Sequence, residues 1–257
     1  MLWLNDMKRN IPLEIEPLKA LQEFTSARIA IGLVGTSIPL KQSLEFKLAH
    51  AHARDAVYSE LDINNLSDLL KQFNLPVLHL QSMVTHRRQY LQRPDLGRKL
   101  SNASVNLLSH YSIGAGVAIV IADGLSATAV NENTYRLLLA LIPLYTAANF
   151  KLAPISLVEQ GRVAIGDDIS DGLRAKLSLV LIGERPGLSS ADSLGAYLTY
   201  NPKPGLTDET RNCISNIRPG GLSYIKAAKK IFYLTNEAFK RKLSGMALKD
   251  DTGLLES

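Results

Sequence analysis

Six consecutive apolar residues, Val117 to Ala122, constrain the fold of this chain more than any other feature. Four of the six are β-branched, and the run lies between Gly114-Ala-Gly and Asp123-Gly124. A strand with no polar position is typical of a parallel sheet whose two faces are both covered by helices. The run therefore predicts a buried parallel strand in an α/β fold.

Helical and extended patterns alternate after residue 115, which predicts a doubly wound parallel sheet. The extended stretches flanking Gln160-Gly161 are interpreted as a hairpin or paired turn. The expected elements are a helix from Glu132 to Ala148, hairpin segments Ala153–Glu159 and Arg162–Ile165, strands Ser178–Ile182, Ala196–Tyr200 and Cys213–Ile217, and a helix from Ser223 to Leu243.

Three regions are expected along the chain. Residues 1–26 form an N-terminal arm, residues 27–113 a smaller and mainly helical N-terminal domain, and residues 114–257 the α/β domain. Leu44, Leu48 and Ala51 recur at helical spacing, and a second amphipathic helix is predicted from Asp62 to Phe73.

Composition excludes several classes of protein. Lys and Arg number 29 against 24 Asp and Glu, a net charge of +5, but no basic run or basic-aromatic stripe indicates nucleic-acid binding. The single cysteine, Cys213, rules out an intrachain disulfide and favours a reducing compartment. The longest apolar stretch, Leu137–Tyr145, is about half the ~20 residues that a membrane span needs. A cytoplasmic protein without membrane contact is expected.

Common enzyme motifs are missing. Gly114-Ala-Gly precedes its strand, so it is not a dinucleotide fingerprint, and neither a P-loop nor a nucleophile elbow is present. His50 and His52 are two residues apart on a predicted helix, so they point to different faces and cannot hold one metal ion. No catalytic residue and no metal ligand is predicted on this chain.

Two predicted strands run into loops rich in Gly, Pro and charge. Ser178–Ile182 is followed by GERPG, and Cys213–Ile217 by RPGG. Ligands of open α/β sheets bind outside the carboxyl ends of strands, so function is expected here. Glu184 follows a buried strand directly and needs either a ligand or a partner such as Arg185. Cys213 is either a small buried hydrophobe or a reactive thiol, and the second requires a pKa below the usual value of about 8.5.

Two other candidates stay open. Asp123 ends the central strand, where it could meet a ligand or accept backbone N–H bonds within its own turn. The second candidate is a cluster of four charged residues: Arg93, Asp95, Arg98 and Lys99. This cluster could bind an anion or the acidic side chains of a partner, or it could be the solvated start of a helix.

Five strings together resemble one family: LAHAHARDAV, YLQRPDLGRKL, VIADGLSATAV, GERPGL and RNCISNIRPGG. From about Arg28 to Gly245, the chain is similar to the light chain (small subunit) of ethanolamine ammonia-lyase. The resemblance implies a lyase that uses adenosylcobalamin to convert ethanolamine to acetaldehyde and ammonia. It also implies a Rossmann-like light chain that closes over the cobalamin against a catalytic large subunit, in heterodimers that assemble into a higher oligomer.

The family's cofactor contacts correspond here to Val163 in GRVAI, Glu184 in GERPGL and Cys213 in NCISN. Glu184 is expected to accept N–H bonds from corrin amides, and the other two to contact the nucleotide tail. The D-x-H-x-x-G motif that supplies a cobalt-binding histidine in other cobalamin proteins is missing, so the cofactor is expected to keep its own benzimidazole on cobalt.

The chain departs from its relatives at Leu33, where many carry Arg, and in its short arm, which leaves residence in a bacterial microcompartment open. Two alternatives to a cobalamin subunit remain. A stand-alone Rossmann-like enzyme or nucleotide-binding module would need a phosphate loop that is missing. A scaffold for the large subunit would make no cofactor contact.

Overall fold

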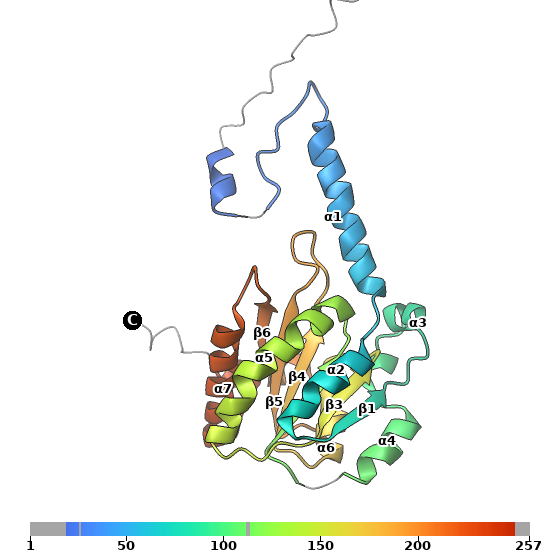
Figure 1. The fold of residues 1–257 in the computed structure, drawn as a ribbon, viewed down its shortest axis with the longest axis vertical. Coiled ribbons are helices and arrows are strands. Elements are labelled where there is room, and N and C mark those ends of the chain that lie inside the picture. The colour runs from blue at the N-terminus through green and yellow to red at the C-terminus, as the bar shows by residue number, and fades with distance from the viewer. Residues whose placement is uncertain (1–18, 26, 112–113, 250–257) are drawn as a thin grey trace, which may run out of the picture. The chain divides into compact units, whose positions relative to one another are not determined.

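The computed structural model describes residues 19–25, 27–111 and 114–249 of the 257-residue chain. Its centre is a six-stranded sheet in the order β1-β3-β2-β4-β5-β6 (Figure 1). The strands are β1 (Val77–Gln81), β2 (Val117–Ala122), β3 (Ile155–Glu159), β4 (Leu177–Gly183), β5 (Leu194–Tyr200) and β6 (Arg211–Ile217).

The predicted central strand, β2, has the expected bounds and is buried at all six positions. Val117, Ile119 and Ile121 point into one apolar core, and the smaller set Ala118, Val120 and Ala122 points into the other. This division follows from the period of two along a strand. The uniformly apolar run is therefore explained by two cores that share one strand.

Helices cover both faces of the sheet. The core on one face contains residues of α2 (Ile63–Leu70), α5 (Ala127–Ala147) and α7 (Tyr224–Arg241). The core on the other face contains residues of α4 (Asn102–Ser109) and α6 (Ile165–Gly172). The remaining helices are α1 (Leu40–Tyr58) and α3 (Arg87–Gln92), with short 3-10 turns at Lys19–Glu23, Lys71–Phe73, Leu96–Arg98, Asp208–Thr210 and Gly245–Ala247.

Caps explain where several helices begin. Ser126 Oγ accepts the N–H of Ala129, so α5 starts directly after it and earlier than the expected Glu132. The Asp62 carboxylate accepts the N–H of Asn65 and starts α2, as the sequence pattern suggested. Among the described residues, no helix is long and apolar enough to cross a membrane.

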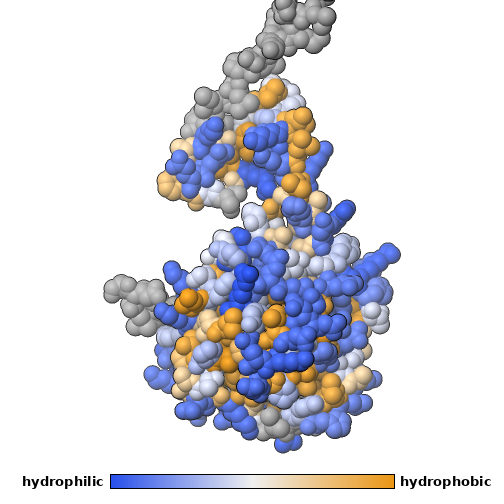
Figure 2. Space-filling view, in the orientation of Figure 1, coloured by the Kyte–Doolittle hydropathy of each residue, from blue (hydrophilic) through white to orange (hydrophobic). Residues whose placement is uncertain are grey.

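The chain forms two compact units. The larger contains residues 54–186 and 190–257, with the whole sheet, and the smaller contains residues 1–53 and 187–189. In the smaller unit, α1 leaves Leu40, Leu44 and Leu48 exposed, and apolar side chains are visible along it in Figure 2. Within that unit, Arg28 donates to the Leu188 carbonyl at 3.4 Å.

The expected doubly wound parallel sheet is only partly present, and the Rossmann-like arrangement is not confirmed. β1, β3, β2 and β4 are parallel, but β5 is antiparallel to both β4 and β6, so the sheet is mixed. The reason lies in residues 184–193 between β4 and β5, which contain no helix. Such a short connection cannot carry the chain back across the sheet, so the next strand returns antiparallel.

The predicted hairpin around Gln160-Gly161 is wrong. β3 pairs in parallel with β1 and β2, and residues 162–164 form a turn that leads into α6. The division into regions at residues 26 and 113 stays a prediction. Most of the arm lies outside the described residues, and β1, from the expected helical part, is a strand of the sheet.

Candidate functional site

The carboxyl ends of β2, β4 and β6 meet at one edge of the sheet. Ala122 pairs with Ile182, Gly183 with Leu194, and Leu194 in turn with Ile217. Because β6 runs in the same direction as β4, the GERPG and RPGG loops share this edge, as the sequence predicted. An open crevice of about 400 Å³ lies here, lined by Tyr90, Gly124, Leu125, Arg162, Val163, Ile182, Gly183, Glu184, Arg185 and Tyr197.

Two glycines allow the loops after β2 and β4 to touch. The Leu125 N–H donates to the Gly183 carbonyl at 2.9 Å, and Gly124 has a φ of +60°. A Cβ at Gly183 would overlap the Ser126 carbonyl, and one at Gly124 would overlap Gly183. The floor of the crevice therefore depends on backbone contact that no other residue permits.

Asp123 organises the loops behind this floor. Its buried carboxylate accepts the backbone N–H groups of Gly124, Gln160 and Gly161 at 2.9–3.0 Å, and lies 3.7 Å from Arg87 Nη1. Burial raises the pKa of Asp123 to about 6, against the lowering effect of these N–H donors and of Arg87. Of the two roles left open by the sequence, the turn-stabilising one is what the structure shows.

An aromatic ring between two arginines forms one wall. Tyr90 is fully buried, with the Arg87 and Arg162 guanidinium carbons 4.5 and 4.0 Å from its ring centroid. Tyr90 donates its hydroxyl to the Gly161 carbonyl at 3.1 Å, and Arg162 Nη2 donates to the Tyr90 carbonyl at 3.0 Å. Arg162 Nε is shielded from solvent and has no hydrogen-bond acceptor.

Glu184 is held by the neighbouring strands. Its Oε2 accepts a short hydrogen bond from the Ser193 hydroxyl and a longer one, 3.3 Å, from the Asn216 N–H. Within the described part of the chain it makes no ion pair with Arg185, which is exposed. Glu184 therefore links the end of β4 to β6 and to the residue before β5, and the alternative of a local Glu184–Arg185 pair is wrong.

Cys213 lies one strand away from the crevice. It pairs in register with Tyr197, which lines the crevice, and the two side chains are hydrogen-bonded. Cys213 is exposed, so the interpretation as a buried hydrophobe is wrong. Desolvation beside the strands raises the pKa of its thiol, Glu184 raises it further, and the Tyr197 hydrogen bond lowers it. The thiol is therefore protonated at neutral pH.

Comparison with known proteins places the chain in a family. The family model for the ethanolamine ammonia-lyase light chain matches residues 15–249. The chain belongs to the ethanolamine ammonia-lyase light chain family. It is 52% identical over 239 residues to the ethanolamine ammonia-lyase small subunit of Pseudomonas fluorescens (strain Pf0-1), covering 91% of this chain and 87% of that one. It is 50% identical over 249 residues to the small subunit of Azotobacter vinelandii, covering 95% and 92%.

In this member of the light chain family, two of the three predicted cofactor contacts, Val163 and Glu184, line one crevice, and Cys213 adjoins it through Tyr197. That these residues bind a cofactor stays a prediction. Sequence reasoning missed Arg162 and Tyr90, because the stretch around Arg162 was interpreted as a hairpin strand. Leu33 is exposed and belongs to the smaller unit, whereas the residues that line this crevice belong to the larger one.

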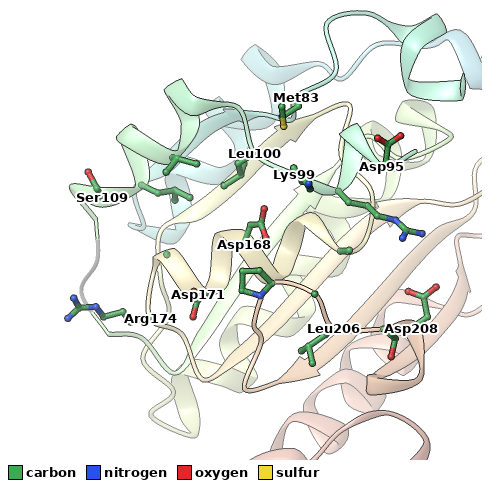
Figure 3. Close-up of a pocket in the computed structure, with 18 residues that line it drawn as sticks. Met83, Asp95, Lys99, Leu100, Ser109, Asp168, Asp171, Arg174, Leu206 and Asp208 are labelled. Atoms are coloured by element: carbon green, nitrogen blue, oxygen red, sulfur yellow. The ribbon is translucent and has the colours of Figure 1, made fainter. Parts of the chain in front are cut away.

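A larger cavity of about 1140 Å³ lies along α6 (Figure 3). It contains none of the predicted cofactor contacts, but Asp95, Arg98 and Lys99 from the charged group that the sequence left open line it. Asp168 and Asp171 on α6 face it, with Asp208 on the loop after β5, and basic side chains from Lys99 and Arg174 also line it. Asp95, another lining residue, pairs with Arg93 at 2.7 Å on the surface. Acidic and basic side chains are mixed along this cavity, and none of its lining residues has a buried polar atom without a hydrogen-bond partner. The smaller crevice is therefore the better candidate site.

Proposed function

We propose that this chain is the small subunit of an adenosylcobalamin-dependent ethanolamine ammonia-lyase, which converts ethanolamine to acetaldehyde and ammonia. In this proposal it closes the cobalamin site at the interface with a catalytic large subunit and is inactive alone. Family membership and the names of its relatives support the reaction and the partner. The chemistry of the crevice supports the cofactor.

The residues of the crevice fit a large ligand with amide and anionic groups. Arg162 Nε is a buried donor that lacks an acceptor, and this orphaned atom is the observation that carries the proposal. Glu184 uses Oε2 for Ser193 and Asn216, and its Oε1 is the acceptor left for a ligand N–H. Val163 and Tyr197 provide apolar surface. An open crevice of about 400 Å³ suits the edge of a corrinoid that a second subunit covers.

Adenosylcobalamin, when bound, supplies the radical chemistry, and the protein provides binding, orientation and protection from water. On this chain, Glu184 is positioned by two strands and accepts N–H groups of the ligand's amides. Cys213 presents a protonated thiol, which contacts the ligand without ligating metal. No residue of this chain handles the substrate, so the groups that bind ethanolamine belong to the large subunit.

The assembly follows from the same role. This chain covers one side of the cofactor, so a second protein surface, that of the large subunit, has to cover the other. The resulting heterodimers then assemble into the higher oligomer. We place the enzyme in the cytoplasm, with a bacterial microcompartment as the alternative location.

The first test co-expresses this chain with its large subunit and purifies the complex by a tag on this chain alone. Co-purification, with acetaldehyde formed from ethanolamine only when adenosylcobalamin is added and none from either subunit alone, supports the proposal. A lone chain that binds neither the large subunit nor cobalamin contradicts it.

A second test separates a cofactor-binding subunit from a scaffold. Glu184→Gln keeps the shape of the side chain but removes its charge, and Cys213→Ser keeps a small polar group. We expect weaker cobalamin binding with assembly intact, measured by absorbance titration of the purified complex. Asp171→Asn, on the exposed face of α6, is the matched control. Unchanged cobalamin affinity in both site variants would favour the scaffold alternative.

A further inference from the structure

The wall of the crevice carries one more positive charge than negative charge. Arg87 and Arg162 lie on Tyr90, and Asp123 is the carboxylate beside them. Asp123 is 3.7 Å from Arg87 Nη1, so these two charges compensate each other. Arg162 makes no ion pair with any carboxylate of the described residues. A partly buried guanidinium without a counter-charge is unfavourable unless something supplies one.

Two guanidinium nitrogens beside Tyr90, Arg87 Nη2 and Arg162 Nε, are buried without a hydrogen-bond acceptor, and of the two residues Arg162 is the one that lines the crevice. Arg162 Nη2 is satisfied by the Tyr90 carbonyl, whereas Nε is out of contact with water and has no acceptor. A buried donor left in this state destabilises the protein, and more so when the group is charged. Charge and hydrogen bonding therefore both require an anionic acceptor at Arg162, which lines the crevice.

Arg162 is also fixed in place before any ligand arrives. Its backbone N–H donates to the Gly97 carbonyl at 2.8 Å, and its guanidinium lies on the ring of Tyr90. A Cβ at Gly97 would come within 2.9 Å of Arg162 Cγ, so the glycine makes room for this arrangement. A side chain held this way loses little conformational entropy on binding.

We propose that Arg162 forms an anion-binding subsite of the crevice and pairs there with the phosphodiester of the cobalamin's nucleotide arm. A guanidinium donates in a planar fork that matches phosphate oxygens. The corrin amides are neutral and would leave the surplus charge uncompensated, whereas the phosphodiester carries one negative charge. This inference rests on the proposed function and adds to it a residue and the group that it binds.

The experiment uses the complex with the large subunit and two corrinoids. Hydroxocobalamin contains the nucleotide phosphodiester, and cobinamide lacks the nucleotide arm. For Arg162→Met, which retains an apolar side chain over Tyr90, we expect an affinity for hydroxocobalamin about 10- to 100-fold weaker. We expect the affinity for cobinamide to change less than about 2-fold. Both dissociation constants are measured by absorbance titration.

Controls separate the subsite from a folding defect. Arg162→Lys keeps the charge and should recover part of the affinity for hydroxocobalamin. Arg185→Met removes an exposed arginine from the same crevice and should have the smaller effect. Equal losses for both corrinoids, or no loss for either, would overturn the proposal, because neither depends on the phosphodiester.

Free phosphate is the other source of this chemistry. Inorganic phosphate is titrated into the complex with hydroxocobalamin bound. If phosphate still binds, and Arg162→Met abolishes that binding without weakening hydroxocobalamin, the nucleotide assignment is overturned. If bound hydroxocobalamin blocks phosphate and bound cobinamide does not, the assignment is supported. Failure of the wild-type complex to bind either corrinoid would instead overturn the proposed function, and the two failures are thus distinguishable.

Discussion

Two clusters of arginine and aspartate are buried in the larger unit, and they differ in charge balance. Arg211, on β6, makes a two-pronged ion pair with Asp167, on α6, at 2.7 and 2.8 Å, and the two side chains are 2% and 1% exposed. At the crevice, by contrast, Arg87 and Arg162 both lie on Tyr90, and of the two only Arg87 is within ion-pair distance of Asp123. In the first cluster the arginine has carboxylate partners, whereas in the second Arg162 makes no ion pair with any described residue.

The difference separates a structural pair from a binding site. Arg211 also donates to Thr199 Oγ1 and to the Leu206 carbonyl, so it ties together β5, β6 and the loop between them. Arg162 Nε and Arg211 Nε are both buried without a hydrogen-bond acceptor, but Arg211 Nε lies 3.5 Å from Asp208 Oδ1. Arg162 makes no ion pair with any described residue, and it lines the crevice where loops after parallel strands meet. Removing a group from the balanced cluster should damage folding, and removing one from the unbalanced cluster should damage binding.

The largest effect is expected at Asp167. Asp167→Ala leaves Arg211 buried without its partner, and the free energy of unfolding should fall by about 3–5 kcal/mol. Asp171→Ala removes an exposed carboxylate from the same helix and should change it by less than about 0.5 kcal/mol. Urea denaturation followed by circular dichroism measures both. Equal values for the two variants would show that the pair does not hold the fold.

The second-largest loss of stability is expected for Gly124→Ala, at the floor of the crevice. Left-handed backbone strain together with overlap at Gly183 should lower the free energy of unfolding by about 2–4 kcal/mol. Gly114→Ala is the matched variant, because its φ of +65° resembles the +60° of Gly124 but a Cβ there meets nothing within 4 Å. The difference between the two losses in the free energy of unfolding measures the close backbone contact between Gly124 and Gly183 alone. Equal losses in the two variants would show that this contact does not exclude a side chain.

Asp123 should make stability depend on pH. Its pKa is about 6 in the folded chain and about 3.9 when unfolded, so the folded state binds this proton more tightly. The stabilisation is therefore present below about pH 4 and is lost as the pH rises through about 6, a change of about 3 kcal/mol. In Asp123→Asn this part of the slope should vanish. The measurement is urea unfolding of both proteins across that pH range, and parallel curves would show that Asp123 titrates normally.

The smallest effect on folding is expected at Arg162. Arg162→Met leaves no buried carboxylate without its ion-pair partner, so we expect a change in the free energy of unfolding of about 1 kcal/mol or less. Arg211→Met leaves Asp167 buried and unpaired and should lose about 3–5 kcal/mol. Thermal and urea unfolding of the two variants test this. A loss at Arg162 as large as that at Arg211 would mean that both clusters are structural.

Local patterns predicted much of the fold. The bounds of β2 followed from an unbroken apolar run, and the α1 and α2 helices followed from the spacing of their apolar residues. The direction of β5 did not follow, because it depends on whether residues 184–193 can cross the sheet. The supposed hairpin strand at 162–165 failed for a similar reason, since short apolar stretches do not distinguish a strand from a helix start.

The candidate site was predicted in part. Glu184 was recognised as a charge that follows a buried strand, and the structure joins it to Ser193 and Asn216. Val163 came from the resemblance alone, since nothing in its local pattern distinguishes it. Arg162 was missed because its environment is made by Tyr90 and Arg87, which are distant in the chain.

The sequence by itself determined the buried strand, the presence of the α1 and α2 helices and the family, because each depends on residues close together in the chain or on strings that can be recognised directly. Only the tertiary structure decided which charges are compensated. Whether Arg162 or Arg211 has a carboxylate partner depends on distances and burial between segments that the fold brings together. Electrostatic energy in a poorly solvated site depends on those distances, and sequence spacing does not supply them.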